Sequence, residues 1–211
     1  MNNVGRTLII ALVLAGTLLW TSSPALADSA TYTETAVASG SLGGASFSDA
    51  LVTITLVGDP STSTTGIFGA FEVFGPATVT VEGIGTASFT DSLAAFDNPT
   101  GYGVGDAGII DSSSFGGIGL DVLDTMDPAF GTYDLTTNIG PITDSSVINP
   151  DDGSCTFCFA TTDGNFVLTD SGTSTFSAST AVPEPGSLCL LGVGLSGLFL
   201  ARRKKAPSAT A

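Results

Sequence analysis

Val52-Thr53-Ile54-Thr55-Leu56 decides the fold class, because apolar and hydroxyl-bearing side chains alternate strictly along it. Thr78-Val79-Thr80-Val81 repeats the same alternation. Successive side chains of a β-strand point to opposite faces of a sheet. Each segment therefore predicts a strand that turns its apolar residues toward a core and its threonines toward solvent.

Similar but shorter patterns recur through the middle of the chain. Strands are expected near residues 30–38, 68–74, 86–90, 118–123 and 173–179, and around the pairs Phe157/Phe159 and Phe166/Leu168. Asp163-Gly164 between two alternating runs indicates a hairpin. No segment has the period of a long amphipathic helix. These features predict an all-β fold, a single antiparallel β-sandwich or jelly-roll-like domain over residues 28–181. Residues 97–114 are Gly-rich and weakly patterned, and are expected to form a long loop.

Residues 1–27 have the features of a secretory signal peptide. Arg6 supplies the positive start, residues 8–20 the apolar stretch, and Ala25-Leu26-Ala27 a small-x-small cleavage site before Asp28. An uncleaved N-terminal anchor is the alternative, and the cleavage site argues against it. We expect a signal helix here and export through the Sec translocon.

The last thirty residues combine three elements in order. Val182-Pro183-Glu184-Pro185 is a stiff, extended spacer, because proline fixes φ and disfavours helix at the preceding residue. Residues 186–201 are uncharged and form a short candidate transmembrane helix. Arg202-Arg203-Lys204-Lys205 would stay on the cytoplasmic side, with residues 206–211 as a short cytoplasmic end and the rest of the chain outside.

This order of Pro-Glu-Pro, apolar run and basic cluster resembles the PEP-CTERM sorting signal of Gram-negative bacteria over residues 182–205. The same tail is sometimes labelled an ice-binding protein C-terminal domain, a label that implies nothing about ice. The resemblance implies recognition near Pro-Glu-Pro by an exosortase, with the inner-membrane-anchored precursor then released or transferred to the cell surface. It also implies a host that makes exopolysaccharide. An ordinary membrane anchor that is never cleaved is the alternative.

The charge of residues 28–181 is entirely negative. All five Lys and Arg lie at Arg6 and in the 202–205 cluster, the chain has no His, and Glu184 is the only acidic residue outside this segment. Nucleic acid and anionic lipid are therefore poor partners, because phosphate neutralisation needs Lys or Arg. Divalent cations would relieve the self-repulsion of such a domain.

Cys155-Thr156-Phe157-Cys158 is the one local cysteine motif in the domain. An exported location favours a disulfide. In a straight strand these two Cα atoms would lie about 10 Å apart, whereas a disulfide needs less than about 7 Å. The motif is therefore either a disulfide in a turn, which is the favoured reading, or an unpaired couple in a strand. A redox or zinc pair is a third reading that lacks the expected context.

Residues 116–124 resemble one copy of the calcium-binding nonapeptide of RTX proteins, Gly-Gly-x-Gly-x-Asp-x-apolar-x. The resemblance makes Asp121 and Asp124 candidate metal ligands. Only one copy is present, and such sites are built from stacked repeats. A Gly-rich turn that leads into a strand explains the same residues.

The composition argues against catalysis. The segment 28–181 lacks His, Lys and Arg, no Gly-x-Ser-x-Gly motif is present, and the single Trp, Trp20, falls in the signal peptide. We expect a non-enzymatic cell-surface or extracellular-matrix protein, sorted by an exosortase and associated with exopolysaccharide. The alternative is a secreted module that binds Ca²⁺ or polysaccharide. No cofactor other than Ca²⁺ is expected.

Overall fold

The computed structural model describes residues 29–66, 69–112, 120–151, 155 and 157–181, all within one compact unit, Ala27–Ala181. The predicted signal helix and transmembrane helix lie outside these residues. Within the described part of the chain, no helix has the length and apolarity needed to cross a membrane. The helical elements described there are three short 3-10 turns, η1 (Pro60–Thr62), η3 (Gly101–Gly103) and η5 (Pro128–Thr132).

Antiparallel strands make up most of the unit, as predicted. Their bounds are β1 (Ala30–Leu42), β2 (Ala45–Gly58), β3 (Thr64–Thr65), β4 (Phe71–Phe74), β5 (Ala77–Val81), β6 (Gly85–Ser88), β7 (Leu93–Asn98), β8 (Asp106–Asp111), β9 (Leu120–Met126), β10 (Ile139–Val147), β11 (Phe159–Thr161) and β12 (Gly164–Thr180).

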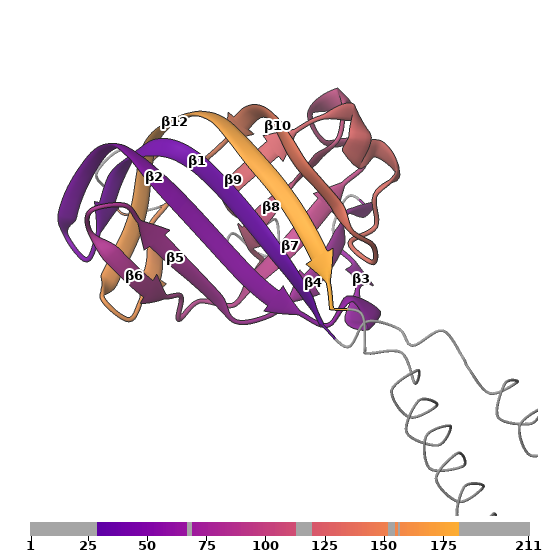
Figure 1. Ribbon diagram of the computed structural model, residues 1–211, viewed down its shortest axis with the longest axis horizontal. Helices are drawn as coiled ribbons and strands as arrows, with labels where there is room; N and C mark the ends of the chain where they lie inside the picture. Colours follow the sequence, from indigo (N-terminus) through magenta and orange to yellow (C-terminus); the bar gives the residue numbers. More distant parts are fainter. Residues whose placement is uncertain (1–28, 67–68, 113–119, 152–154, 156, 182–211) are drawn as a thin grey trace, which may run out of the picture. The chain divides into compact units, whose positions relative to one another are not determined.

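The strands form one continuous sheet in the order β3-β4-β7-β8-β9-β10-β12-β1-β2-β5-β6, with β11 paired to β12. Strand β10 joins the two halves, because residues 139–145 pair with β12 whereas Ser146 and Val147 pair with β9. The sheet curls into a half-barrel, so β1 and β2 lie across β8, β7 and β4 (Figure 1). The prediction of an antiparallel all-β domain is therefore confirmed, but a single curled sheet replaces the two separate sheets of a sandwich.

The alternating segments behave as the sequence predicts. Val52, Ile54 and Leu56 are fully buried, whereas Thr53 and Thr55 lie on the opposite face. Strand β5 pairs with β2 so that Val79 lies opposite Ile54. The predicted hairpin is also present, since Thr161 pairs with Gly164 across a two-residue turn. The buried aliphatic residues of β2 and β5 pack in the core between the two halves of the sheet.

Aromatic rings pack in the core at both ends of β12. Phe176 contacts Phe130 edge-to-face, with ring centroids 5.6 Å apart, and Tyr133 packs against the same ring at 6.3 Å. Phe166 makes a second edge-to-face pair with Phe89 at 5.9 Å. Each such pair adds about 0.5–1.5 kcal/mol beyond the area that it buries.

The prediction of a long loop over residues 97–114 is wrong. The loop expectation rested on absent alternation, yet Asp106–Asp111 forms β8, a central strand in which every residue is buried. Its neighbour β7 is almost wholly buried as well. A strand covered on both faces has no solvent-facing row, so its residues need not alternate in polarity. Strand β10 was not expected either.

Candidate functional site

The residues of the predicted sorting signal and processing sites lie outside the described residues. They are Val182, Pro183, Glu184, Pro185, Arg202, Arg203, Lys204, Lys205, Ala25, Ala27 and Asp28. Among the described residues, the candidate functional features are the cysteine pair, the buried acidic residues and the outer face of the sheet.

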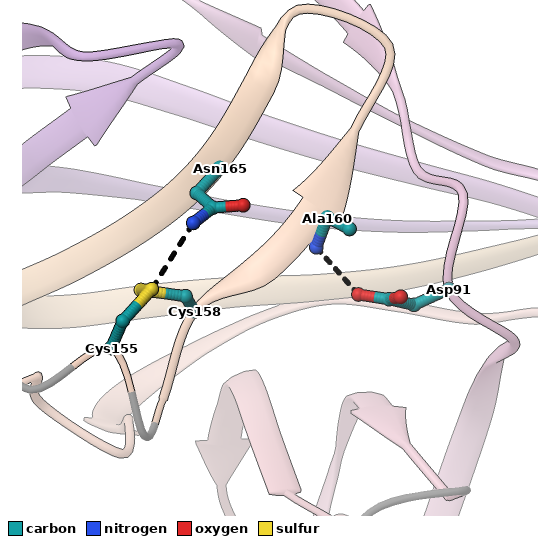
Figure 2. The surroundings of a disulfide bond; sticks show 5 residues. All are labelled: Asp91, Cys155, Cys158, Ala160 and Asn165. Carbon is teal, nitrogen blue, oxygen red and sulfur yellow. Dashed lines mark hydrogen bonds between the residues drawn. A yellow bond between two sulfur atoms is a disulfide. The ribbon is translucent and has the colours of Figure 1, made fainter.

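Cys155 and Cys158 form a disulfide directly before β11, with their Cα atoms 4.9 Å apart. The chain turns here rather than running straight, and Cys155 has a left-handed backbone with φ of 58°. Asn165 on the facing strand donates from Nδ2 to Sγ of Cys155 at 3.1 Å, as Figure 2 shows. On the other side of β11, the amide of Ala160 donates to Oδ2 of Asp91 at 2.5 Å. The disulfide thus fixes the entry into the β11–β12 hairpin.

Asp121 and Asp124 lie within strand β9, not in a turn. The register with β8 shifts between them: Gly108 lies opposite Asp124, whereas Ile110 lies opposite Asp121. The shift marks a β-bulge, in which one strand carries an extra residue and the strict alternation of faces is broken. Two residues three apart therefore project from the same face of the sheet.

Asp106 on β8 completes a group that we call the outer acidic cluster, made of Asp106, Asp121 and Asp124. Asp106 shares its face with Gly108 and Ile110, because residues two apart in a strand point the same way. It is therefore a diagonal neighbour of Asp124 on the face turned away from the core. The sequence offered no signal for Asp106, since its segment was expected to be a loop.

Polar residues border the outer acidic cluster. Asn149 donates to the backbone carbonyl of Asp121 at 3.2 Å. Asn149 and Tyr102 also donate to the carboxyl group of Asp121. The backbone of Tyr102 is left-handed, with φ of 49°. A methyl group on Gly101 would collide with Oδ1 of Asp106, so the backbone of η3 lies directly against this carboxyl.

Burial raises the pKa of the cluster's carboxyls. It raises the pKa of Asp106 to about 7, with the charge of Asp121 adding to the effect. The pKa of Asp124 is held well above its ordinary range by burial first, and then by Asp121, Asp106 and Glu34. Burial also raises the pKa of Asp121, although its hydrogen bonds act in the opposite direction.

Other buried carboxyls lie on the core side of the sheet, and Glu34 and Asp97 are the two that are fully buried. Glu34 on β1 is fully buried and accepts from the hydroxyl of Thr125 at 2.6 Å. Asp97 on β7 is also fully buried, and burial, followed by the charges of Asp106 and Asp134, raises its pKa to about 8. Sequence reasoning missed both. Glu34 could have been predicted from the sequence. It occupies an inward position of an alternating strand, between Tyr32 and Ala36, where an apolar residue is expected.

In the described part of the chain, no three acidic, Cys or His side chains already converge as the ligands of one metal ion. The candidate ligands Asp121 and Asp124 come close through the β-bulge, but they are not assembled into a closed cage. The buried carboxyls thus lie on both sides of one sheet, with Asp106 and Asp124 on the outer face and Glu34 and Asp97 on the core side.

The outer face of the other half of the sheet carries rows of hydroxyl groups, which we call the hydroxyl face. One row takes a threonine from each of six strands, in cross-strand register: Thr143, Thr175, Thr35, Thr53, Thr80 and Thr86. The next row is Ser177, Thr33, Thr55, Thr78 and Ser88. The residues that alternate with them along the chain, such as Ile54 and Val79, point into the core.

Some of these hydroxyls bond to one another. The Oγ1 atoms of Thr80 and Thr86 lie 2.8 Å apart, and those of Thr143 and Thr175 lie 2.6 Å apart. Strands in a sheet are about 4.8 Å apart, so each row presents hydroxyls at a regular spacing. No residue of either row is charged. The face is thus a neutral, hydroxyl-rich surface on a strongly acidic domain.

A family model described as the PEP-CTERM protein-sorting motif matches residues 181–204. The match takes in Val182–Pro185, the apolar run and Arg202–Lys204, and it does not reach the last strand, which ends at Thr180. No curated protein and no solved structure matches the chain. The matched residues contain the Pro-Glu-Pro segment, the apolar run and most of the basic cluster that the sequence predicts as the sorting signal. The chain therefore carries a PEP-CTERM protein-sorting motif over residues 181–204 and is an exported protein addressed to an exosortase.

Proposed function

We propose that this chain is a non-enzymatic surface or matrix protein, whose β domain associates with exopolysaccharide after an exosortase has processed the tail. The PEP-CTERM motif at residues 181–204 is the observation that supports processing by an exosortase. The hydroxyl face is the observation that supports association with exopolysaccharide. The signal peptide at residues 1–27 would deliver the precursor to the Sec translocon, and the apolar run would hold it in the inner membrane.

Recognition by the exosortase and insertion into the membrane depend on different parts of the tail. Insertion depends on the apolar run at 186–201 and on the basic cluster, whereas the exosortase reads the Pro-Glu-Pro segment. Replacing Glu184 with Gln, or both Pro183 and Pro185 with Ala, should therefore leave insertion intact and stop release. The product would be a longer, membrane-bound form.

Mass spectrometry of surface-associated protein, from the host with and without its exosortase, tests this step. The expected mature protein lacks the residues beyond about Pro185 only when the exosortase is present. Recovery of the intact 202–211 tail on surface protein from both strains would support the plain-anchor alternative instead.

Polysaccharide binding through the hydroxyl face is supported by its chemistry. Sugar hydroxyls exchange hydrogen bonds readily with Thr and Ser hydroxyls, and a neutral face avoids the repulsion that the remaining acidic surface would exert on anionic chains. Antiparallel pairing of the strands keeps the rows in register. An uncharged surface with regularly spaced hydroxyls suits an extended neutral or weakly charged polymer.

The double substitution Thr53→Val with Thr80→Val tests this binding, because valine keeps the β-branched shape and removes only the hydroxyl. Thr64→Val with Thr65→Val, on β3 at the opposite end of the sheet order, is the matched control. We expect the full chain to bind purified host exopolysaccharide, the first variant to bind more weakly, and the control to bind normally. Equal binding by all three proteins would refute a role for the hydroxyl face.

A non-catalytic role is supported by the placement of the carboxyls. Glycoside hydrolysis requires two carboxyls that reach the same sugar from a cleft. Glu34 and Asp97 are sealed in the core, and residues 28–181 contain no His, Lys or Arg to complement them. The second candidate function is a secreted module that binds Ca²⁺, and the outer acidic cluster is the observation that favours it.

A further inference from the structure

The outer acidic cluster is more than a concentration of acidic residues on a surface. Asp124 is fully buried, and neither of its carboxyl oxygens has a hydrogen-bond partner. Asp106 is 3% exposed, and its Oδ1 also lacks a partner. Burying a polar atom without a hydrogen bond costs about 1–3 kcal/mol, and burying an unpaired charge costs far more. These oxygens therefore need something to neutralise or coordinate them.

The protein itself provides no positive side chain for this purpose. Every Lys and Arg of the chain lies at position 6 or in the 202–205 cluster, and there is no His. Asp121 increases the negative charge at the site rather than relieving it. The remaining possibilities are protons and a cation from solution.

The arrangement of the carboxyls favours a divalent cation, because one such ion can neutralise two carboxylates that share a face of the sheet. The backbone packs closely around two of the carboxyls: a Cβ on Gly101 would collide with Oδ1 of Asp106, and a Cβ on Gly108 would collide with Cα and Cβ of Asp124. The β-bulge in β9 turns Asp121 and Asp124 to the same face as Asp106. Tyr102, which is 64% exposed, donates to the carboxyl of Asp121 at the edge of the cluster.

We propose that the outer acidic cluster binds one Ca²⁺ ion, with the carboxylates of Asp106 and Asp124 as its protein ligands. Asp121, held by Asn149 and Tyr102, supplies further negative charge, and water completes the coordination. Calcium fits because it prefers oxygen ligands, accepts six to eight of them in irregular geometry, and tolerates water among them. Zinc sites are built from nitrogen and sulfur as well as oxygen, and the described cluster offers only oxygen donors. The proposal rests on the second candidate function, to which it assigns the ligands, and it does not depend on sorting or on polysaccharide binding.

The experiment uses the full chain in a mild detergent at about pH 8, where protons compete least with calcium for the carboxylates. Thermal unfolding is followed with either CaCl₂ or EGTA, and calorimetry measures the stoichiometry. At about a hundredfold excess of calcium over Kd, we expect Tm to rise by about 5–10 °C, with one ion bound per chain.

Asp106→Asn and Asp124→Asn should each abolish the calcium-dependent rise in Tm. Asn is nearly isosteric and neutral, so both variants should fold in EGTA, and their Tm in EGTA reports this directly. Asp170→Asn removes an exposed carboxylate from β12 and should leave the calcium response unchanged. Equal Tm in CaCl₂ and EGTA for the wild type, or an unchanged response in both cluster variants, would overturn the proposal.

Discussion

The hydroxyl of Thr125 donates to Oε1 of Glu34 at 2.6 Å, which joins β9 to β1 across the inside of the curled sheet. The same hydroxyl lies 2.6 Å from Oγ of Ser174 on β12, and Ser174 donates to the backbone carbonyl of Asp124 at 2.8 Å. These bonds lie where β10 changes partner from β12 to β9. A polar link thus bridges the two halves of the sheet close to the point where they are joined.

Thr125→Val should weaken this link at nearly constant volume. The substitution leaves Oε1 of Glu34 without its donor and Ser174 without one partner, in a fully buried environment. We expect a loss of about 1–3 kcal/mol in the free energy of unfolding, measured by urea denaturation. Thr125→Ser keeps the hydroxyl and should cost less. A Val variant as stable as the wild type would mean that the bridge contributes nothing net.

The stability of the domain should fall as pH rises. Burial raises the pKa of Asp97 to about 8, whereas an unfolded Asp titrates near 4. Between these values the folded state holds a proton that the unfolded state has released, so stability is greatest at low pH and is lost as pH rises through the folded pKa. We expect Tm to fall by several degrees between about pH 6 and pH 9.

Asp97→Asn is the matched variant for this pH dependence. It keeps the side chain neutral at every pH, so its Tm should change less over the same range. The comparison is made with EGTA present, so that calcium does not contribute. A wild-type Tm that is constant or rises toward pH 9 would contradict the assignment of Asp97 as a buried neutral carboxyl.

The strands that sequence reasoning found are those with one face in the core and one in solvent. Val52, Ile54 and Leu56 alternate with Thr53 and Thr55 because the hydroxyl face is open. Strands β7 and β8 are buried on both faces, so no alternation marks them. Asp106–Asp111 has acidic residues at both ends of a short apolar stretch with a glycine in its middle, and it resembles a loop by composition.

The candidate site could be predicted only in part, for a related reason. The resemblance to a calcium-binding repeat predicts Asp121 and Asp124 as ligands, but strict alternation along a strand predicts that they lie on opposite faces. Their common face depends on the bulge in β9, and Asp106 joins them only through the pairing of β8 with β9. Register between strands is a long-range property that local patterns do not encode.

The disulfide should be complete in the exported protein. Cys155 and Cys158 should resist alkylation without reductant, and mass spectrometry of the alkylated protein measures this. Because the bond closes a loop of only four residues, its loss in the variant Cys155→Ser with Cys158→Ser should cost about 2 kcal/mol or less. Full alkylation of both cysteines under non-reducing conditions would show that the pair is unlinked.

Gly108 should be sensitive to the smallest possible side chain. It lies in β8 opposite Asp124, and a Cβ atom there would come within 2.6 Å of Cα and Cβ of Asp124, and would also collide with the carbonyl of Leu123. These contacts involve backbone that is fixed by strand pairing, so it cannot move away cheaply. Gly108→Ala should therefore destabilise the domain by about 1–3 kcal/mol.

Gly172 on β12 is the matched control, because a Cβ added there meets nothing within 4 Å. Gly172→Ala should be neutral or stabilising by up to about 1 kcal/mol, since alanine restricts the unfolded chain. Urea denaturation of both variants measures the difference, and equal stabilities would mean that β8 and β9 do not pair in this register.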